Sequence, residues 1–190
     1  MGIGQLKSIE YPPKKNRRKK PTAPMEIAKT KGPSTVADWI AIGVATAGGA
    51  GFMPAAPGTA GAAVGVVVYL VMEGLNVGSY YPHAIILLLV AGIWASWRVE
   101  ELYGHDSQRI VIDEVVGQMI TFVAAAGRVR LPALDVVIGF GLFRLFDIVK
   151  PFPIRRLERL KGGMGVMADD IGAGIYALVL LLIWRAVFRG

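Results

Sequence analysis

The sequence predicts an all-α fold: a polytopic membrane helical bundle of about five transmembrane helices, with an extra interfacial or re-entrant N-terminal helix. Two observations predict it. Hydrophobic residues make up 54% of the 190 residues and charged residues only 18%, with a mean hydropathy of +0.50, which is more apolar than ordinary soluble domains. The apolar residues also gather into long runs. The run from Ile85 to Ala95 has no polar face, which a helix on a soluble protein needs. A soluble all-α core with unusually apolar helices is the alternative.

The chain divides near residue 35. Residues 1–35 form a basic N-terminal tail that we expect to be disordered, and residues 36–190 form the membrane-embedded domain. The net charge of +7 comes largely from the Lys and Arg residues of segment 14–20. Such a tail can bind nucleic acid or an anionic lipid surface. Beside so much apolar sequence, we expect the lipid bilayer as its partner and no nucleic acid.

The apolar sequence consists of one interrupted segment followed by five further runs. Segment 36–51 is apolar but interrupted by Asp38 and by several glycines, so we expect it to lie at the membrane interface or to re-enter rather than to span. Five later runs approach the roughly 20 residues that a spanning helix needs. They cover residues 58–78, 83–98, 111–127, 134–149 and 170–188.

The distribution of Lys and Arg between the loops predicts the orientation. With a cytoplasmic tail and five spans, loops 98–110 and 150–169 are cytoplasmic, and the second of these is strongly basic. The opposite loops offer only Arg128 and Arg130 before the C-terminus. If segment 36–51 also spanned the membrane, the tail would lie opposite the basic loops, which this distribution disfavours.

This topology brings polar elements together at the cytoplasmic ends of helices. The first is the segment Pro54–Thr59. The second is Asp113-Glu114, where Asp113 shares a helical stripe with Gly117 and Thr121. Ionisable groups at membrane depth usually mark function or tight pairing. The alternative is that one of the two acids only caps its helix.

Two further polar elements join them. Arg144, Asp147 and Lys150 share one helical face, either as part of a site or as an intrahelical ion pair that makes buried charge tolerable. Asp169 and Asp170 follow a glycine-rich segment, 162–167, which we interpret as a loop whose backbone amides can face phosphate oxygens.

The five acids predict a metal site. Carboxylates are hard oxygen ligands, and the chain contains no cysteine, so the set favours Mg²⁺ over zinc. A metal held by carboxylates with cations nearby is the arrangement that phosphoryl transfer uses. His105, in the adjacent loop, is either a general acid or base or a solvated loop residue. The expected ligands are Asp113, Glu114, Asp147, Asp169 and Asp170.

Together these motifs resemble the phosphatidylglycerophosphatase A family, in order and with compatible spacing, from about residue 46 to about residue 180. The matching motifs are Pro54-Ala-Ala-Pro-Gly-Thr-Ala-Gly61, His105-Asp106, Asp113-Glu-Val-Val-Gly117, Phe143-Arg-Leu-Phe-Asp147 with Lys150-Pro-Phe-Pro-Ile-Arg155, and Gly162-Gly-Met-Gly-Val-Met-Ala-Asp169-Asp170.

The resemblance implies a Mg²⁺-dependent, multi-pass lipid phosphatase of the bacterial inner membrane whose active site faces the cytoplasm. Its substrate would be the phospholipid phosphatidylglycerophosphate, hydrolysed to phosphatidylglycerol and phosphate in phospholipid biosynthesis. We expect Asp113, Asp147, Asp169 and Asp170 to be catalytic, and Arg144, Lys150, Arg155 and Thr59 to bind the substrate phosphate.

Several alternatives stay open at this point. Either water attacks the phosphate directly or an aspartate attacks first and forms an aspartyl-phosphate. Two rivals are not phosphatases: a membrane transport protein for Mg²⁺ or protons that uses the intramembrane carboxylates, and a scaffold whose charges only pair. The sequence is compatible with either a monomer or a homo-oligomer.

Overall fold

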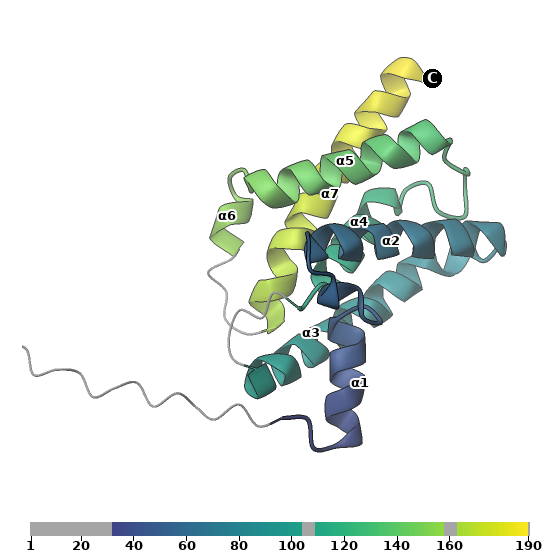
Figure 1. Cartoon of the computed structure of the whole chain (residues 1–190). Coiled ribbons are helices and arrows are strands. Elements are labelled where there is room, and N and C mark those ends of the chain that lie inside the picture. Colours follow the sequence, from purple (N-terminus) through teal and green to yellow (C-terminus); the bar gives the residue numbers. More distant parts are fainter. Residues whose placement is uncertain (1–31, 104–108, 158–162, 190) are drawn as a thin grey trace, which may run out of the picture.

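The computed structural model describes residues 32–103, 109–157 and 163–189, and throughout these ranges the regular structure is helical. The predicted tail, apart from residues 32–35, and the loop residues His105 and Asp106 lie outside them. The α-helices are α1 (Val36–Ala45), α2 (Pro57–Gly74), α3 (Tyr81–Tyr103), α4 (Ile112–Phe122), α5 (Ala133–Val149), α6 (Ile154–Leu157) and α7 (Gly163–Phe188), and 3₁₀ turns cover Ala50–Phe52 and Gly78–Tyr80 (Figure 1).

The all-α prediction is confirmed, and several helix boundaries differ from the predicted ones. α3 runs on to Tyr103, because Arg98 and the two glutamates after it are good helix formers. α4 ends at Phe122 instead of continuing to residue 127. α7 begins at Gly163, so the predicted glycine loop is wrong over 163–167: these residues already form the first turns of a helix. The short helix α6 was not predicted.

Three helical segments within the described residues are long and apolar enough to cross a membrane: Pro57–Gly74, Gly78–Tyr103 and Met167–Phe188. α4 has 11 residues and α5 has 17, which at 1.5 Å per residue give about 16 and 26 Å against a hydrocarbon core of about 30 Å. Length and composition therefore support three of the five predicted spans.

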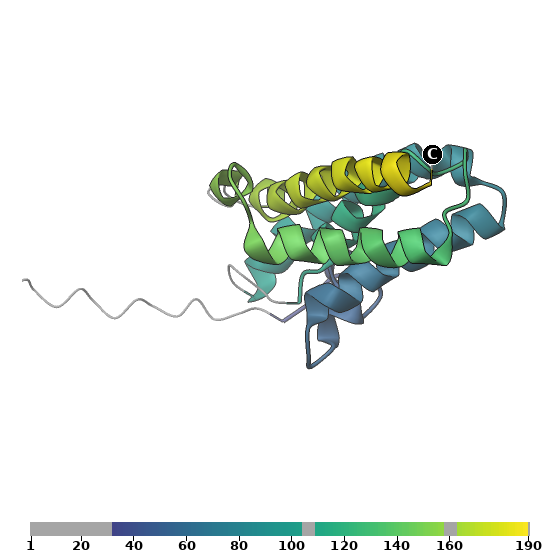
Figure 2. The same cartoon turned by 90° about the horizontal axis from the view of Figure 1, so that it is seen from above.

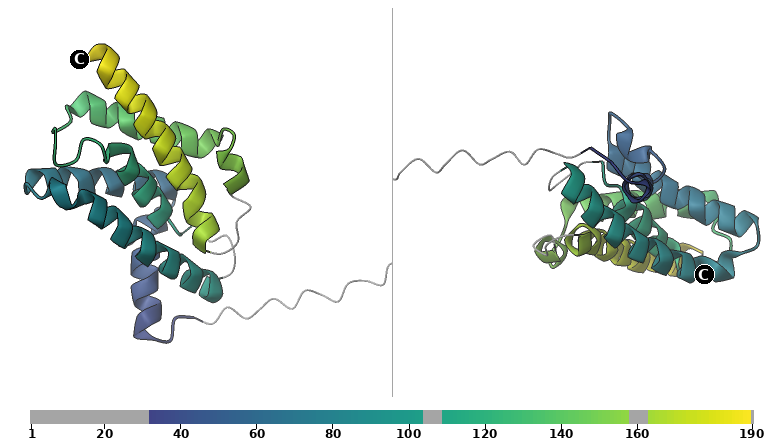
Figure 3. Two further views of the ribbon diagram at one scale, coloured as in Figure 1. Left: turned by 180° about the vertical axis from the view of Figure 1, so that it is seen from behind. Right: turned by 90° about the horizontal axis from the view of Figure 1, so that it is seen from below.

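α4 is the central helix, packed against α2, α3, α5 and α7 (Figures 1 and 3). Glycines make this close packing possible. A Cβ on Gly61 would lie 2.7 Å from the backbone oxygen of Val111, and a Cβ on Gly117 would lie 2.6 Å from the backbone oxygen of Asp170. Small residues at such positions let helix backbones approach closely inside a membrane. α4 is therefore covered by its neighbours, and most of its residues are buried.

An aromatic cluster closes the bundle beyond the C-terminal end of α4. The Tyr69 ring packs edge-on against Tyr81, with centroids 5.8 Å apart, and against Phe122 at 4.9 Å. The Tyr69 hydroxyl accepts a hydrogen bond from the backbone N–H of Leu131 at 3.1 Å. At the same end the N–H of Gly127, in a left-handed conformation (φ 67°), donates to Glu73 Oε1 at 2.6 Å. This end of the molecule is held by aromatic packing and by hydrogen bonds from backbone N–H groups to the side chains of Tyr69 and Glu73.

A buried acid joins the start of α5 to the end of α7, which run side by side (Figure 2). Asp135 is fully buried, and its carboxylate lies 3.4 Å from Nε of both Arg185 and Arg189. The indole N–H of Trp184 donates to the same carboxylate at 3.3 Å. Removal of one partner of a buried ion pair usually destabilises a protein, so we assign Asp135 a structural role.

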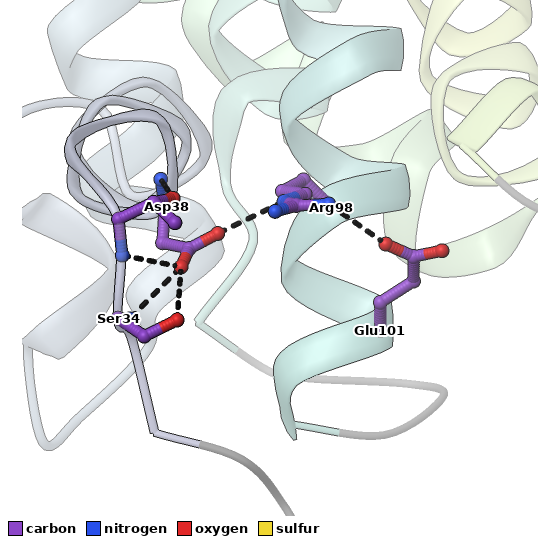
Figure 4. A network of polar contacts seen from close by, with 5 residues as sticks. Ser34, Asp38, Arg98 and Glu101 are labelled. Carbon is purple, nitrogen blue, oxygen red and sulfur yellow. Dashed lines mark hydrogen bonds and ion pairs between the residues drawn. The ribbon is translucent and has the colours of Figure 1, made fainter.

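α1 runs across the direction of α2 and is attached to the C-terminal half of α3 (Figures 1 and 3). Asp38, the residue that interrupts the apolar segment, makes the attachment. Its carboxylate accepts from the backbone N–H groups of Ser34 and Thr35, both at 2.9 Å, and from Nε of Arg98 at 2.9 Å (Figure 4). The hydrogen bond from the Ser34 N–H is the largest cause that lowers the pKa of Asp38 below its usual range. Asp38 therefore stays ionised and caps α1.

Candidate active site

The candidate site is built around three carboxylates from two helices. Asp113 and Glu114 lie in the first turn of α4, and Asp170 lies two turns into α7. Each offers an oxygen, and these oxygens all lie within 4.8 Å of one another. The contact between Gly117 and the Asp170 backbone places the two helix segments side by side.

Three like charges this close repel one another strongly unless cations or protons intervene. Asp113 Oδ1, Glu114 Oε2 and Asp169 Oδ1 are buried and have no hydrogen-bond partner among the described residues. Buried oxygens usually have partners, so these three are suited to a divalent cation that prefers oxygen ligands.

α5 adds an ion pair to the same place. Arg144 Nη1 donates to Asp147 Oδ2 one helical turn away, so the ion pair that the sequence suggested is present. This ion pair also lies next to acids of α4 and α7. Asp147 is close enough to Glu114 and Asp170 to repel both, and Arg144 attracts Glu114. The Nε of Arg144 is buried without a hydrogen-bond partner in the described structure, so this donor is suited to an oxygen of a bound group.

A second ion pair joins the end of α5 to α7. Lys150, in a left-handed conformation (φ 46°) at the C-cap of α5, places its Nζ 2.6 Å from Asp169 Oδ2. The helix ends here because Pro151 follows. Asp169 and Asp170 are adjacent, so Lys150 fixes one carboxylate beside the three-acid cluster. The fold therefore brings together the acidic and basic residues of α4, α5 and α7 that the sequence predicted to converge, whereas their membrane face and their roles stay predictions.

The first turn of α2 completes this end of the bundle. Pro57 occupies the first helical position, where its missing N–H costs no hydrogen bond. A Cβ on Gly58 would collide with the Glu114 carboxylate and would lie 3.2 Å from Arg144 Nη1. A helix N-terminus favours anions, so the backbone of this turn suits a phosphate group.

Two of the predicted phosphate-binding residues line pockets next to these elements, and their binding of phosphate stays a prediction. Arg155 is exposed on α6 and lines a pocket of about 380 Å³ together with Lys150, Arg156 and Phe152. Thr59 lines a different, apolar groove on the outer side of α2. Sequence reasoning missed this groove, although alanines spaced three and four residues apart on α2 were a usable signal. No described contact joins either side chain to the three-acid cluster.

The chain is similar in sequence to several known proteins. A model of the family described as Phosphatidylglycerophosphatase A matches residues 43–185. A Bacteroides thetaiotaomicron protein named "Putative phosphatidylinositol-3-phosphatase" is 40% identical over 148 residues, covering 76% of this chain and 92% of that protein. Two proteins named "Phosphatidylglycerophosphatase A", from Haemophilus influenzae and Escherichia coli, are 35% and 36% identical over 138 residues, covering 70% of this chain and 81% and 76% of theirs. No solved structure matches.

Proposed function

This chain belongs to the phosphatidylglycerophosphatase A family, and on that premise we propose that it hydrolyses the terminal phosphomonoester of phosphatidylglycerophosphate to phosphatidylglycerol and phosphate. The observation that carries the proposal is the cluster of three carboxylate oxygens within 4.8 Å, with Arg144 beside it, at one end of an apolar helical bundle. A phosphatase that acts on a lipid needs both features: a polar site for the headgroup and an apolar body for the bilayer.

We propose that the site works with Mg²⁺, held by Asp113, Glu114 and Asp170, with Asp147 and Asp169 as further ligands either directly or through water. The bound ion would polarise the phosphate and favour its attack by water. The unpartnered buried oxygens of Asp113, Glu114 and Asp169 support this assignment, because they supply the oxygen donors that the ion prefers.

The positively charged side chains of the site would bind the phosphate oxygens. Arg144 lies between Asp147 and Glu114, and its unpartnered Nε can donate to a phosphate oxygen. Lys150 is held at the edge of the cluster by Asp169, and Arg155 is on the adjacent exposed surface. We propose that Arg155 attracts the anionic headgroup and that Arg144 and Lys150 stabilise the charge that develops during transfer.

The rival transport function is less well supported. A transport path needs carboxylates through the depth of the membrane, whereas the five site acids gather at one end of the bundle. Asp135, which lies toward the other end, is neutralised by Arg185 and Arg189.

The test is phosphate release by the purified protein in detergent micelles that contain phosphatidylglycerophosphate, with and without Mg²⁺. We expect release with Mg²⁺ and little after chelation. Phosphatidylinositol 3-phosphate should be tested in parallel, because the relative from Bacteroides thetaiotaomicron carries that activity in its name. A folded protein that releases phosphate from neither lipid would contradict the proposal.

We also propose five spans, although α4 is shorter than the hydrocarbon core: α4 crosses inside the bundle, covered by its neighbours, and α5 crosses with the three longer helices. In this arrangement α1 lies at the interface, and the site faces the cytoplasm of a bacterial inner membrane. The exposed apolar side chains Val36, Trp39 and Ile40 of α1 suit an interfacial position. Arg155 and Arg156 lie beside the site, as the bias of basic residues toward the cytoplasm predicts.

The chain has no cysteine, so single cysteines can report this topology without background. Phe152→Cys, on the exposed surface beside the site, and Arg128→Cys, on the exposed turn after α4, should lie on opposite sides. We expect an impermeant maleimide to label Arg128→Cys in spheroplasts and Phe152→Cys only after permeabilisation. Equal labelling of both, or the reverse order, would refute the orientation.

A further inference from the structure

An apolar groove of about 460 Å³ lies on the outer side of α2, against the connection that precedes this helix. It is lined by small and apolar side chains, with Thr59 as its one hydroxyl-bearing residue. The lining residues are Ala50, Met53, Ala55, Ala56, Thr59, Ala60, Ala63, Val64 and Val67.

One end of the groove lies at the first turn of α2, the turn that also contacts the candidate active site. Thr59 lines it, and the preceding residue, Gly58, lies against both the Glu114 carboxylate and Arg144. On a helix, consecutive residues point to neighbouring faces. One face of the first turn of α2 therefore borders the carboxylates, and the next face opens into the groove.

The groove is also open to the surroundings of the bundle. Met53 is 54% exposed and Val67 is 55% exposed, so its rim reaches the outer surface. From Thr59 to Val67 it follows α2 for eight residues, or about 12 Å. That length is close to the roughly 15 Å thickness of half a hydrocarbon core.

We propose that this groove holds an acyl chain of the phospholipid whose phosphate is bound at the carboxylate site. The proposal rests on the proposed function, because it places the apolar part of the same substrate. The occupant follows from three observations together: the walls are apolar, one end lies at the turn of α2 that contacts the carboxylates, and the rim is exposed on the outside of the bundle.

The groove would act by positioning the substrate rather than by adding much binding energy. Neighbouring lipid tails are as apolar as the walls of the groove, so a chain gains little from moving out of the bilayer into it. A chain seated between Met53 and the alanines of α2 would instead fix where its headgroup stands. Small misplacements at a reacting centre have large effects on rate. Methionine adapts to chains of different shape.

The experiment fills the groove and compares two substrates. Ala63→Phe places a ring in the groove, and Ala60→Leu does so closer to the site with a smaller change. Ala186→Phe, at an exposed alanine of α7 outside the groove, is the matched control. Each variant is assayed on long-chain phosphatidylglycerophosphate in mixed micelles and on its deacylated, water-soluble headgroup, after its thermal unfolding has been compared with that of the wild type.

We expect both groove variants to lower kcat/KM for the long-chain lipid by about tenfold or more, as misplacement of the reacting group does, while turnover of the deacylated headgroup and all rates of Ala186→Phe stay near wild type. Equal losses on both substrates, or no loss on either, would overturn the proposal. Failure of the wild type to hydrolyse either substrate would instead count against the proposed function itself.

Discussion

Asp170→Asn is expected to lower phosphate release by more than about 100-fold, because even groups that only support metal ligands usually contribute 10- to 100-fold. Asp170 is buried on α7 and shares the cluster with Asp113 and Glu114. The substitution keeps the size of the side chain and removes one of three mutually repelling charges. Thermal unfolding in detergent should therefore occur at the wild-type temperature or above it, while activity is lost.

Asp135→Asn is the control for this prediction, since it changes an equally buried acid with a different environment. Asp135 is paired with Arg185 and Arg189, so its neutralisation leaves two cations without their partner. We expect a lower unfolding temperature with near-normal activity in the protein that remains folded. If Asp170→Asn retained activity within a few-fold of wild type, the three-acid cluster would not be the active site.

Gly58→Ala is expected to reduce activity by about 10- to 100-fold through misplacement of the groups around the phosphate. The added methyl group would collide with the Glu114 carboxylate and approach Arg144, and both side chains have flexible ends that can move away. The helix itself should tolerate the change, because alanine has a higher helix propensity than glycine.

The matched control is Gly141→Ala, one turn from Arg144 on α5, where an added methyl group meets nothing within 4 Å. It should leave phosphate release unchanged. Both variants are measured for phosphate release from micellar phosphatidylglycerophosphate and for thermal unfolding. The added methyl group must displace Glu114 and Arg144. Wild-type activity in Gly58→Ala would therefore show that these two side chains do not act on the substrate.

The sequence was most informative where polar residues stand in apolar runs. Asp113, Glu114, Asp147 and Asp170 could be assigned to one site, because ionisable groups are rare in such surroundings and helix periodicity fixes their faces. The start of α7 was predicted too late, because Gly163 and Gly165 suggested a loop, whereas in the fold Met167 is buried against Gly92 of α3 and the helix continues through this segment.

Other features depend on contacts between residues far apart in the chain. Asp38 was noticed only as an interruption, and its pairing with Arg98, 60 residues away, became visible in the fold (Figure 4). The groove beside α2 likewise needs both α2 and the connection that contains Met53. The apolar residues continue past the end of α4 over 123–126, so a hydropathy window could not locate that end at Phe122.

The central claim is that the carboxylates of α4 and α7 hold the ion on which hydrolysis depends. It is tested most directly by the Mg²⁺ dependence of phosphate release in Glu114→Gln compared with wild type. We predict that the variant needs a higher Mg²⁺ concentration for half-maximal rate and regains part of its activity at saturating Mg²⁺, because one ligand oxygen has lost its charge. An unchanged half-maximal Mg²⁺ concentration, at whatever maximal rate, would contradict the claim.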